Sequence, residues 1–378
     1  MPKILEIDKR NEYSLVVNAN LPLPEMVGWP PHRLLKFRGP LGRHKFSETL
    51  ALLSLLFNRV DVFHIGSPLE EDAAIIPQFG KLRPCNVVCT LYDLIPYLFY
   101  EHYLAENDPF RSIYEYRLTN VKRADLIFAI SEHTRHDAIK YLRLPPEKVI
   151  TVGTGVDPFF RSFSVDRQKW ERALREKFGI DRKFLFYIGG TDWRKNITGL
   201  IESFARLSPI IRSEYLLVIT CSLSDGELKQ YGEVAAKCGI DKTVILTNFV
   251  SQEILAALYT LCTVFVFPSL YEGFGLPIAE AMCCGAPLIA GNSSSLPEVI
   301  GDAGVLVDAA SAEELSGAML KVLTDKRLRL EMSERSRKRS VDFSWEKVAK
   351  EVISAYEALG KANRCSFSFR PTEIKTQR

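Results

Sequence analysis

The sequence predicts an α/β protein of two domains, each built on a parallel β-sheet that helices cover on both faces. Short apolar runs alternate with helical patterns along most of the chain, which is typical of such sheets. The 378 residues exceed what one hydrophobic core usually holds, which favours two domains. With 47% hydrophobic and 25% charged residues, the composition is that of a globular protein.

The first half of the chain contains five candidate strands, at 13–19, 61–67, 86–93, 125–131 and 148–154. Helical patterns lie between them at 47–58 and near 109–123. The second half contains six candidate strands, at 184–190, 215–221, 243–249, 264–268, 286–292 and 303–308. Ser251 and Ser311 are expected to cap helices, and Ser311 with Glu314 fits a capping box.

A polar, charged stretch from Asp157 to Phe178 carries no strand pattern, which predicts an interdomain linker followed by a helix. We therefore place one domain at 1–160 and the other at 161–342. The run at 343–359 is an amphipathic helix. The basic tail at 361–378 is predicted to be disordered.

Charge, hydropathy and cysteine usage exclude several classes of protein. A net charge of +3 is too small to argue for a nucleic-acid partner. No apolar run approaches the roughly 20 residues that span a bilayer, and the first residues lack the pattern of a signal peptide. The eight cysteines are scattered without a CxxC pair, which indicates reduced, packed thiols rather than metal ligands. We therefore expect a cytoplasmic protein.

Residues 269–285, SLYEGFGLPIAEAMCCG, follow an apolar run at 263–268 that predicts a buried parallel strand. Gly273 and Gly275 allow the backbone to approach a ligand closely, and Pro277 favours the start of a helix. The predicted layout is a strand, a glycine turn and a helix. The N-terminus of such a helix offers N–H groups and a partial positive charge, which suit a diphosphate.

Two glutamates belong to this segment: Glu272 lies in the glycine turn, and Glu280 lies in the first turn of the expected helix. A carboxylate there accepts hydrogen bonds from a ribose diol, as in dinucleotide sites. We therefore expect Glu280 to hold the ribose and the amides around Phe274 and Gly275 to hold the diphosphate. Glu272 is expected to bind hydroxyls of the sugar that the diphosphate carries. The alternative is a pair of surface glutamates beside an ordinary β–α turn.

The nine residues EGFGLPIAE (272–280) resemble the signature of retaining glycosyltransferases of family 4, and LPEV and GDAG follow at matching offsets. The resemblance runs from about Asp61 to about Leu359. It implies the GT-B fold, in which two Rossmann-like domains with parallel sheets face each other across a cleft. The N-terminal domain would take the acceptor and the C-terminal domain the nucleotide sugar, while the helix at 343–359 would cross back onto the N-terminal domain.

Lys195 lies in GGTDWRKN, directly after a candidate strand and before a helix. A cation there neutralises the diphosphate that glycosyl transfer expels, and the resemblance implies this role for Lys195. The family usually carries an arginine about six residues earlier, where this chain has glycines that include Gly190, a donor-site candidate. Arg194 is expected to replace that arginine, or alternatively to point into solvent.

The chain contains no D-x-D motif, the pair of carboxylates with which metal-dependent sugar transferases hold a divalent ion. This agrees with the metal-free chemistry that the resemblance implies. We therefore expect no metal and no cofactor, with Lys195 and helix N-termini serving instead. No residue stands out as a covalent nucleophile, so the leaving phosphate itself is expected to take the acceptor proton.

Acceptor-side candidates follow strands of the first half. Tyr92 and Asp93, in TLYDLIP, follow a candidate strand and so lie at the carboxyl edge of its sheet, where α/β sheets bind ligands. The family often has a histidine at the position of Tyr92, and Asp93 is expected to orient a sugar hydroxyl, or alternatively to cap a turn. His133 and Arg135 follow the next strand and are either site residues or structural ones.

Two further observations concern the first half of the sequence. No glycine-rich loop precedes Tyr13, although the family normally begins with a strand and such a loop, so the first strand and helix could have been lost or replaced. Aromatic and basic residues gather at 29–38 and 94–104, which indicates either peripheral contact with a membrane or an ordinary core loop and helix face.

The expected function is that of a retaining, metal-independent hexosyltransferase. The segments TLYDLIP and 114–135 are similar to the mannosyl- and rhamnosyl-polymer branch of the family, so GDP-mannose is the first donor expected. The acceptor would be a saccharide or lipid-linked saccharide, in polysaccharide or lipopolysaccharide assembly in the cytoplasm or at the inner face of the membrane. Two alternatives remain: a UDP- or dTDP-sugar transferase with a small acceptor, and a non-catalytic GT-B binding or scaffold module.

Overall fold

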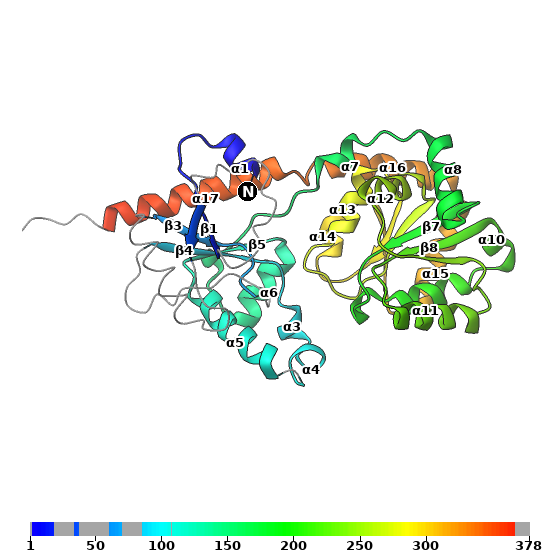
Figure 1. Cartoon of the computed structure of the whole chain (residues 1–378), viewed down its shortest axis with the longest axis horizontal. Coiled ribbons are helices and arrows are strands. Elements are labelled where there is room, and N and C mark those ends of the chain that lie inside the picture. The colour runs from blue at the N-terminus through cyan, green and yellow to red at the C-terminus, as the bar shows by residue number, and fades with distance from the viewer. Residues whose placement is uncertain (1, 19–33, 38–59, 70–84, 107, 367–378) are drawn as a thin grey trace, which may run out of the picture. The chain divides into compact units, whose positions relative to one another are not determined.

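The computed structural model describes residues 2–18, 34–37, 60–69, 85–106 and 108–366, and Figure 1 labels its helices and strands where there is room. The chain divides into two compact units. The first comprises residues 1–130, 134–153 and 346–378, and the second comprises 131–133 and 154–345. The boundary expected after 160 lies seven residues beyond the observed one after 153, and the boundary expected after 342 lies three residues before the observed one after 345.

The first unit contains a four-stranded parallel sheet in the order β3-β4-β5-β6. Its strands are β3 (Val62–Ile65), β4 (Asn86–Leu91), β5 (Leu126–Ala129) and β6 (Val149–Thr151). Each lies inside a run that the sequence predicted as a strand. The helices assigned around this sheet are α1 (Pro2–Ile7), α3 (Ile95–Leu98), α4 (Tyr100–Tyr103), α5 (Asp108–Arg123), α6 (Glu132–Leu142) and α17 (Trp345–Ser366), with a 3₁₀ turn, η2 (Pro146–Lys148).

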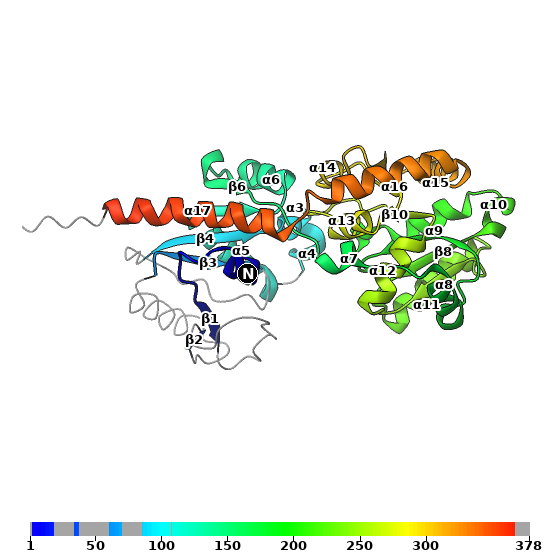
Figure 2. The ribbon, with the colours of Figure 1, turned by 90° about the horizontal axis from the view of Figure 1, so that it is seen from above.

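The first sheet buries both faces because alternate residues of a strand point to opposite sides. Val88 and Phe128 lie in one apolar cluster with α1 and with Val352 and Ile353 of α17. Val87, Cys89, Leu91, Ile127 and Ala129 lie in the other cluster with residues of α5 and α6. Figure 2 shows α17 running along the sheet. Two-sided burial explains why these strands read as continuous apolar runs.

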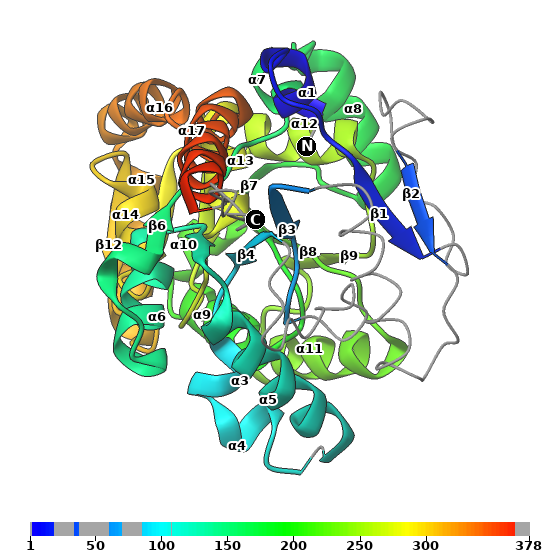
Figure 3. The same ribbon diagram turned by 90° about the vertical axis from the view of Figure 1, so that its left-hand side faces the viewer.

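Two further strands, β1 (Leu15–Asn18) and β2 (Leu34–Phe37), pair in parallel with each other and form a separate sheet (Figure 3). β1 was expected from the sequence, whereas β2 was missed because it lies within the aromatic and basic run at 29–38. The expected helix at 47–58 lies outside the described residues, as do residues 19–33.

The second aromatic run, 94–104, forms α3 and α4. Leu94, Ile95 and Leu104 are buried, and Leu98, Tyr100 and Tyr103 pack against the first unit's core. This arrangement corresponds to the alternative of a core loop and helix face. Among the described helices, none combines the length and apolar character needed to cross a bilayer.

The second unit contains a six-stranded parallel sheet in the order β12-β11-β10-β7-β8-β9. Its strands are β7 (Lys183–Ile188), β8 (Tyr215–Thr220), β9 (Val244–Thr247), β10 (Val264–Phe267), β11 (Leu288–Gly291) and β12 (Gly304–Val307). All six lie in or within one residue of predicted strands. The order is that of dinucleotide-binding folds, and it reverses between β7 and β10. Ligands of such sheets bind where the order reverses, beyond the carboxyl ends of the strands.

The helices of this unit are α7 (Pro158–Ser162), α8 (Arg167–Phe178), α9 (Ile197–Ala205), α10 (Pro209–Glu214), α11 (Asp225–Lys237), α12 (Gln252–Leu261), α13 (Leu276–Cys283), α14 (Leu296–Ile300), α15 (Ala312–Thr324) and α16 (Lys326–Ser340). Helices cover both faces of the second sheet: α11 and α15 lie below it in Figure 1, and α8, α12, α13 and α16 lie above it. Helix α9 packs against α11 and α15. The segment expected as linker plus helix forms α7 and α8.

Side-chain caps begin several of these helices. Ser251 and Ser311 accept hydrogen bonds from the Ile254 and Glu314 amides, which confirms both as N-caps. The expected capping box at Ser311 is not closed, because the Glu314 carboxylate accepts from the Asp308 amide instead. A complete box lies at Ser224 and Glu227, at the start of α11, and was missed.

The last helix, α17, begins two residues later than expected and continues to Ser366. It therefore extends six residues into the segment predicted to be disordered, and 367–378 lie outside the described residues. Seven of the eight cysteines are free thiols, namely Cys85, Cys89, Cys221, Cys238, Cys262, Cys283 and Cys284.

Candidate active site

Two loops at the reversal point of the second sheet carry the charged residues that the sequence singled out. The loop after β7 contains a 3₁₀ turn, η3 (Trp193–Lys195), and the loop after β10 contains Glu272. Because β7 and β10 are neighbours in the sheet, residues 77 apart in sequence meet here. The motifs around Lys195 and Glu272 predicted that both residues belong to one site.

The Lys195 ammonium donates to the Glu272 carboxylate, with 2.5 Å between Nζ and Oε1. Both side chains are largely buried, with exposed fractions of 18% for Lys195 and 10% for Glu272. The ammonium also lies over the Phe267 ring. The pair places a cation and a carboxylate at the edge of the sheet. The ammonium still has N–H donors for a polar ligand, and the carboxylate can still accept hydrogen bonds from one.

Arg194 joins the loop after β7 to the loop after β10 through hydrogen bonds. Its carbonyl accepts from the Leu270 amide at 2.7 Å, and its Nη1 donates to the Tyr271 carbonyl at 2.9 Å. Its Nε lies 2.9 Å from the Asp192 carboxylate. Arg194 is buried, so the alternative of a solvent-facing arginine is wrong. Its role as a phosphate ligand remains a prediction.

Helix α13 begins at Leu276, with Gly275 as N-cap and Pro277 as its second residue. Gly275 has φ of +100°, a backbone conformation that residues with a Cβ rarely adopt. Since the helix begins before Pro277, Glu280 is its fifth residue and lies in the second turn rather than the first. The loop Gly273–Phe274–Gly275 is buried against the protein, whereas Gly190 is exposed.

Glu280 is held by the Tyr259 hydroxyl, which donates to its Oε2 at 3.0 Å. Tyr259 lies on α12 and is fully buried against Phe186 and Phe265. Burial raises the pKa of Glu280 to about 7; the bond from Tyr259 lowers it, and the charge of Asp157 raises it. Tyr259 was not predicted from the sequence; its only signal there is a single tyrosine with a polar tip on an otherwise aliphatic helix face.

We expect Gly275→Ala to lower the unfolding free energy by about 2 kcal/mol, since it adds backbone strain and overlap. A Cβ at this position would lie 2.8 Å from Leu296 Cδ2. Gly239→Ala is the matched control, because Gly239 has φ of +67° but no atom within 4 Å of the added Cβ. Its expected cost is about 1 kcal/mol. Chemical denaturation of both variants measures the difference, and equal losses would contradict the role of overlap.

The acceptor-side candidates of the first unit have structural contacts. The Asp93 carboxylate accepts from the Ile95 amide at 2.9 Å, which is the turn-capping role. Tyr92 is exposed, and its carbonyl accepts from the Thr134 hydroxyl. Arg135 donates to the carbonyls of Val149 and Pro146. Their acceptor-side roles remain predictions.

Residues 131–133 group with the second unit. His133 Nε2 lies 2.9 Å from the Tyr271 hydroxyl, and the two rings meet edge to face. Tyr271 directly precedes Glu272, so this contact places His133 beside the loop that carries the candidate carboxylate.

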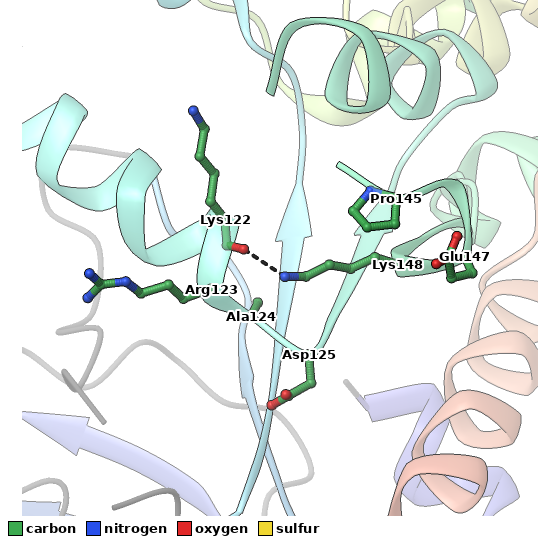
Figure 4. A pocket seen from close by; sticks show the side chains of 7 residues that line it. All are labelled: Lys122, Arg123, Ala124, Asp125, Pro145, Glu147 and Lys148. Atoms are coloured by element: carbon green, nitrogen blue, oxygen red, sulfur yellow. Dashed lines mark hydrogen bonds between the residues drawn. The ribbon is translucent and has the colours of Figure 1, made fainter. Parts of the chain in front are cut away.

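None of the candidate site residues lines a cavity of about 460 Å³ in the first unit. It is lined by the segment before β5 and the segment before β6, at the amino edge of the sheet (Figure 4). Lys148 Nζ donates to the Lys122 carbonyl at 2.6 Å, at the C-terminus of α5, where a cation is favourable. No group of three or more metal-ligating side chains occurs among the described residues.

Two family models match the chain. The model of glycosyltransferase family 4 matches residues 9–159, and the model of glycosyl transferases group 1 matches 170–339. The first match begins at residue 9, so the resemblance starts well before Asp61, where the sequence motifs had indicated its start.

Curated relatives include mannosyltransferases of Escherichia coli. The serotype-specific mannosyltransferase WbdA is 33% identical over 84% of this chain and 39% of its own length. The O-antigen chain mannosyltransferase B is 32% identical over 62% of this chain and 61% of its own length. The chain thus spans less than two thirds of these relatives.

Solved structures share the fold. A glycosyltransferase from Rickettsia africae has a TM-score of 0.69 at 16% identity, covering 86% of this chain and 85% of that chain. Sucrose-phosphate synthase from Thermosynechococcus elongatus has a TM-score of 0.69 at 23% identity, covering 90% and 86%. The two family models, the curated relatives and the two large parallel sheets agree: the chain belongs to glycosyltransferase family 4, group 1, and has the GT-B fold.

Proposed function

We propose that the chain transfers a mannosyl group from GDP-mannose to a saccharide hydroxyl, with retention of anomeric configuration, in the assembly of a polysaccharide or lipopolysaccharide. The observation that carries the proposal is the Lys195–Glu272 pair at the reversal point of the second sheet, where such sheets bind nucleotides. The likeness to two E. coli mannosyltransferases supports the choice of sugar.

Each charged residue has a distinct part in this proposal. The Glu280 carboxylate accepts from the ribose diol. Glu272 accepts from hydroxyls of the donor sugar, and Lys195 donates to the diphosphate. The ammonium has three N–H donors, so it can serve the diphosphate while it keeps Glu272 oriented.

The reaction breaks the bond between the anomeric carbon and the diphosphate oxygen. The acceptor hydroxyl forms the new bond on the same face, and its proton passes to the departing diphosphate oxygen. Lys195 and the amides around Phe274 and Gly275 stabilise the charge that develops on that diphosphate. Lys195 takes the place that a divalent ion has in metal-dependent transferases, so we expect transfer to continue in EDTA.

Thermal-shift measurements with GDP, UDP, dTDP and ADP, each in EDTA, test the donor site first, since a ligand that binds the folded state raises the melting temperature. We expect GDP to give the largest shift and Glu280→Ala to lose it. Release of GDP from GDP-mannose, with and without an oligomannoside acceptor, then tests transfer, and the linkage of the product reports retention.

The other outcomes separate the alternatives. A selective shift with UDP or dTDP would replace GDP-mannose by the corresponding sugar donor. Binding of a nucleotide without turnover of its sugar conjugate would favour a non-catalytic binding module. No shift with any nucleotide would contradict the donor site itself.

A further inference from the structure

Three consecutive serines after β11, Ser293, Ser294 and Ser295, hold the loop that carries Glu272; we call them the serine clasp. The Ser293 hydroxyl donates to the Ser269 carbonyl at 3.4 Å. The Ser294 hydroxyl accepts from the Glu272 amide at 2.8 Å. The Ser295 hydroxyl lies 2.9 Å from the carbonyl oxygens of both Glu272 and Phe274. All of these bonds join the ends of two neighbouring strands, β10 and β11.

Ser295 controls the direction of two peptide groups. Its side chain is fully buried, so its hydroxyl is held on the two carbonyls rather than on water. The described chain contains no cis peptide bond, and in a trans peptide the carbonyl and the next N–H point in opposite directions. The N–H groups of Gly273 and Gly275 therefore point away from Ser295, on the side opposite to the clasp.

The backbone of the clasp is strained. Ser294 has φ of +49°, a left-handed conformation that is unfavourable for a residue other than glycine. Asn196, the residue after Lys195, is the other non-glycine residue of the second unit with positive φ among those that the structure describes. Such strain persists where the surroundings over-determine the backbone, and it gathers at functional sites. Here it flanks both members of the Lys195–Glu272 pair.

We propose that Ser295 is a positioning residue of the donor site, which aims the N–H groups of Gly273 and Gly275 at the diphosphate of the donor. The inference rests on the proposed function. Ser295 acts through the two peptide groups and does not touch the ligand. A hydrogen-bond donor held in advance toward an anion avoids reorganisation when the anion arrives, so its contribution falls on the phosphates rather than on the nucleoside.

Ser295→Ala tests the inference through a ligand series. We expect the affinity for GDP to fall roughly tenfold, the worth of one hydrogen bond to a charged group. The affinity for guanosine, which has no phosphate, is expected to change less than about twofold. Calorimetry measures GDP, and competition by NMR at millimolar concentration measures guanosine; UDP and uridine are run in parallel in case the donor base is uracil.

Ser336→Ala is the matched control. Ser336 lies on α16, is fully buried, and donates to the Ala286 carbonyl at 2.9 Å. Its loss removes the same kind of bond elsewhere in the unit, so stability falls while the ratio of GDP to guanosine affinity stays that of the wild type. Ser295→Cys fills the same space with a weaker donor, and we expect it to fold and to show a smaller loss of GDP affinity.

The outcomes separate this inference from the function on which it rests. Wild-type protein that binds none of GDP, UDP, dTDP and ADP would overturn both. Wild-type binding with an unchanged affinity ratio in Ser295→Ala and Ser295→Cys would overturn the positioning role alone. A selective loss of diphosphate affinity in these two variants, absent in Ser336→Ala, would support it.

Discussion

Replacing Glu280 by glutamine is expected to raise the melting temperature at pH 8 while it weakens nucleotide binding. Burial raises the pKa of Glu280 to about 7, above its ordinary value of 4.5. The stability from the protonated form is therefore complete below pH 4.5 and is lost as the pH rises through about 7. At pH 8 the folded protein holds a buried carboxylate, which costs about 1–3 kcal/mol. Glutamine is neutral and still accepts from the Tyr259 hydroxyl.

Binding should change in the opposite direction. A ribose diol donates more strongly to a carboxylate than to an amide, so we expect Glu280→Gln to lower GDP affinity roughly tenfold at pH 8. In the wild type, affinity should fall as the pH drops from 8 to 6, because protonation removes the charged acceptor. In the variant it should be nearly constant over that range. Calorimetry and thermal denaturation at pH 6, 7 and 8 give both quantities.

Glu253→Gln on α12 is the control for the sign of the change in stability. A hydrogen bond from Ser251 lowers the pKa of this exposed carboxyl, so its contribution to stability is present at neutral pH and is lost as the pH falls. We expect a slight loss of stability at pH 8 and no change in binding. A Glu280→Gln protein that is less stable than wild type at pH 8 would show that Glu280 does not resist ionisation. A variant that binds GDP as tightly as wild type would show that Glu280 does not hold the ribose.

Lys195→Met is expected to have the largest effect on turnover, a loss of roughly 1000-fold in transfer rate, since it removes the cation at the departing diphosphate. The same change leaves the Glu272 carboxylate, only 10% exposed, without the ammonium that lies 2.5 Å away. Removing one member of a buried pair costs about 3 kcal/mol. Stability and activity should therefore fall together.

The double variant Lys195→Met/Glu272→Gln separates the two effects. It has no unpaired buried charge, so most of the lost stability should return, whereas transfer should remain absent. Lys350→Met is the control: its pair with Glu346 has a similar distance, 2.6 Å, but both side chains are more than half exposed. Such pairs contribute less than about 1 kcal/mol. Full activity in Lys195→Met would exclude the lysine from the chemistry.

Much of the fold was predictable from local pattern. The strands of both large sheets lie in or within a residue of apolar runs, because strands buried on both faces need apolar residues at every position. β2 was missed because only four residues pair, within a run whose aromatic and basic character indicated other roles. Helix starts were less certain: α13 begins before Pro277, because Gly275 itself adopts the capping conformation.

The candidate residues were found from motif and chemistry, but their partners were not. The run of serines at 293–295 follows a buried strand, and that position at the carboxyl edge of the sheet is the signal that could have identified it. Tyr259 had a weaker signal, a polar tip on an apolar helix face. Arg194 was ambiguous because nothing local reveals the Tyr271 carbonyl that it contacts.

By itself, the sequence determined the alternation of strands and helices and the glycine turn with its two glutamates. These depend on residues close in the chain, through side-chain periodicity and backbone freedom. Only the tertiary structure decided three contacts. The Lys195 ammonium donates to the Glu272 carboxylate, the Tyr259 hydroxyl donates to the Glu280 carboxylate, and the Ser295 hydroxyl donates to two carbonyl groups of the Glu272 loop. Such contacts, and the pKa shift that burial brings, arise from packing between elements distant in sequence, because desolvation depends on what surrounds a group in space.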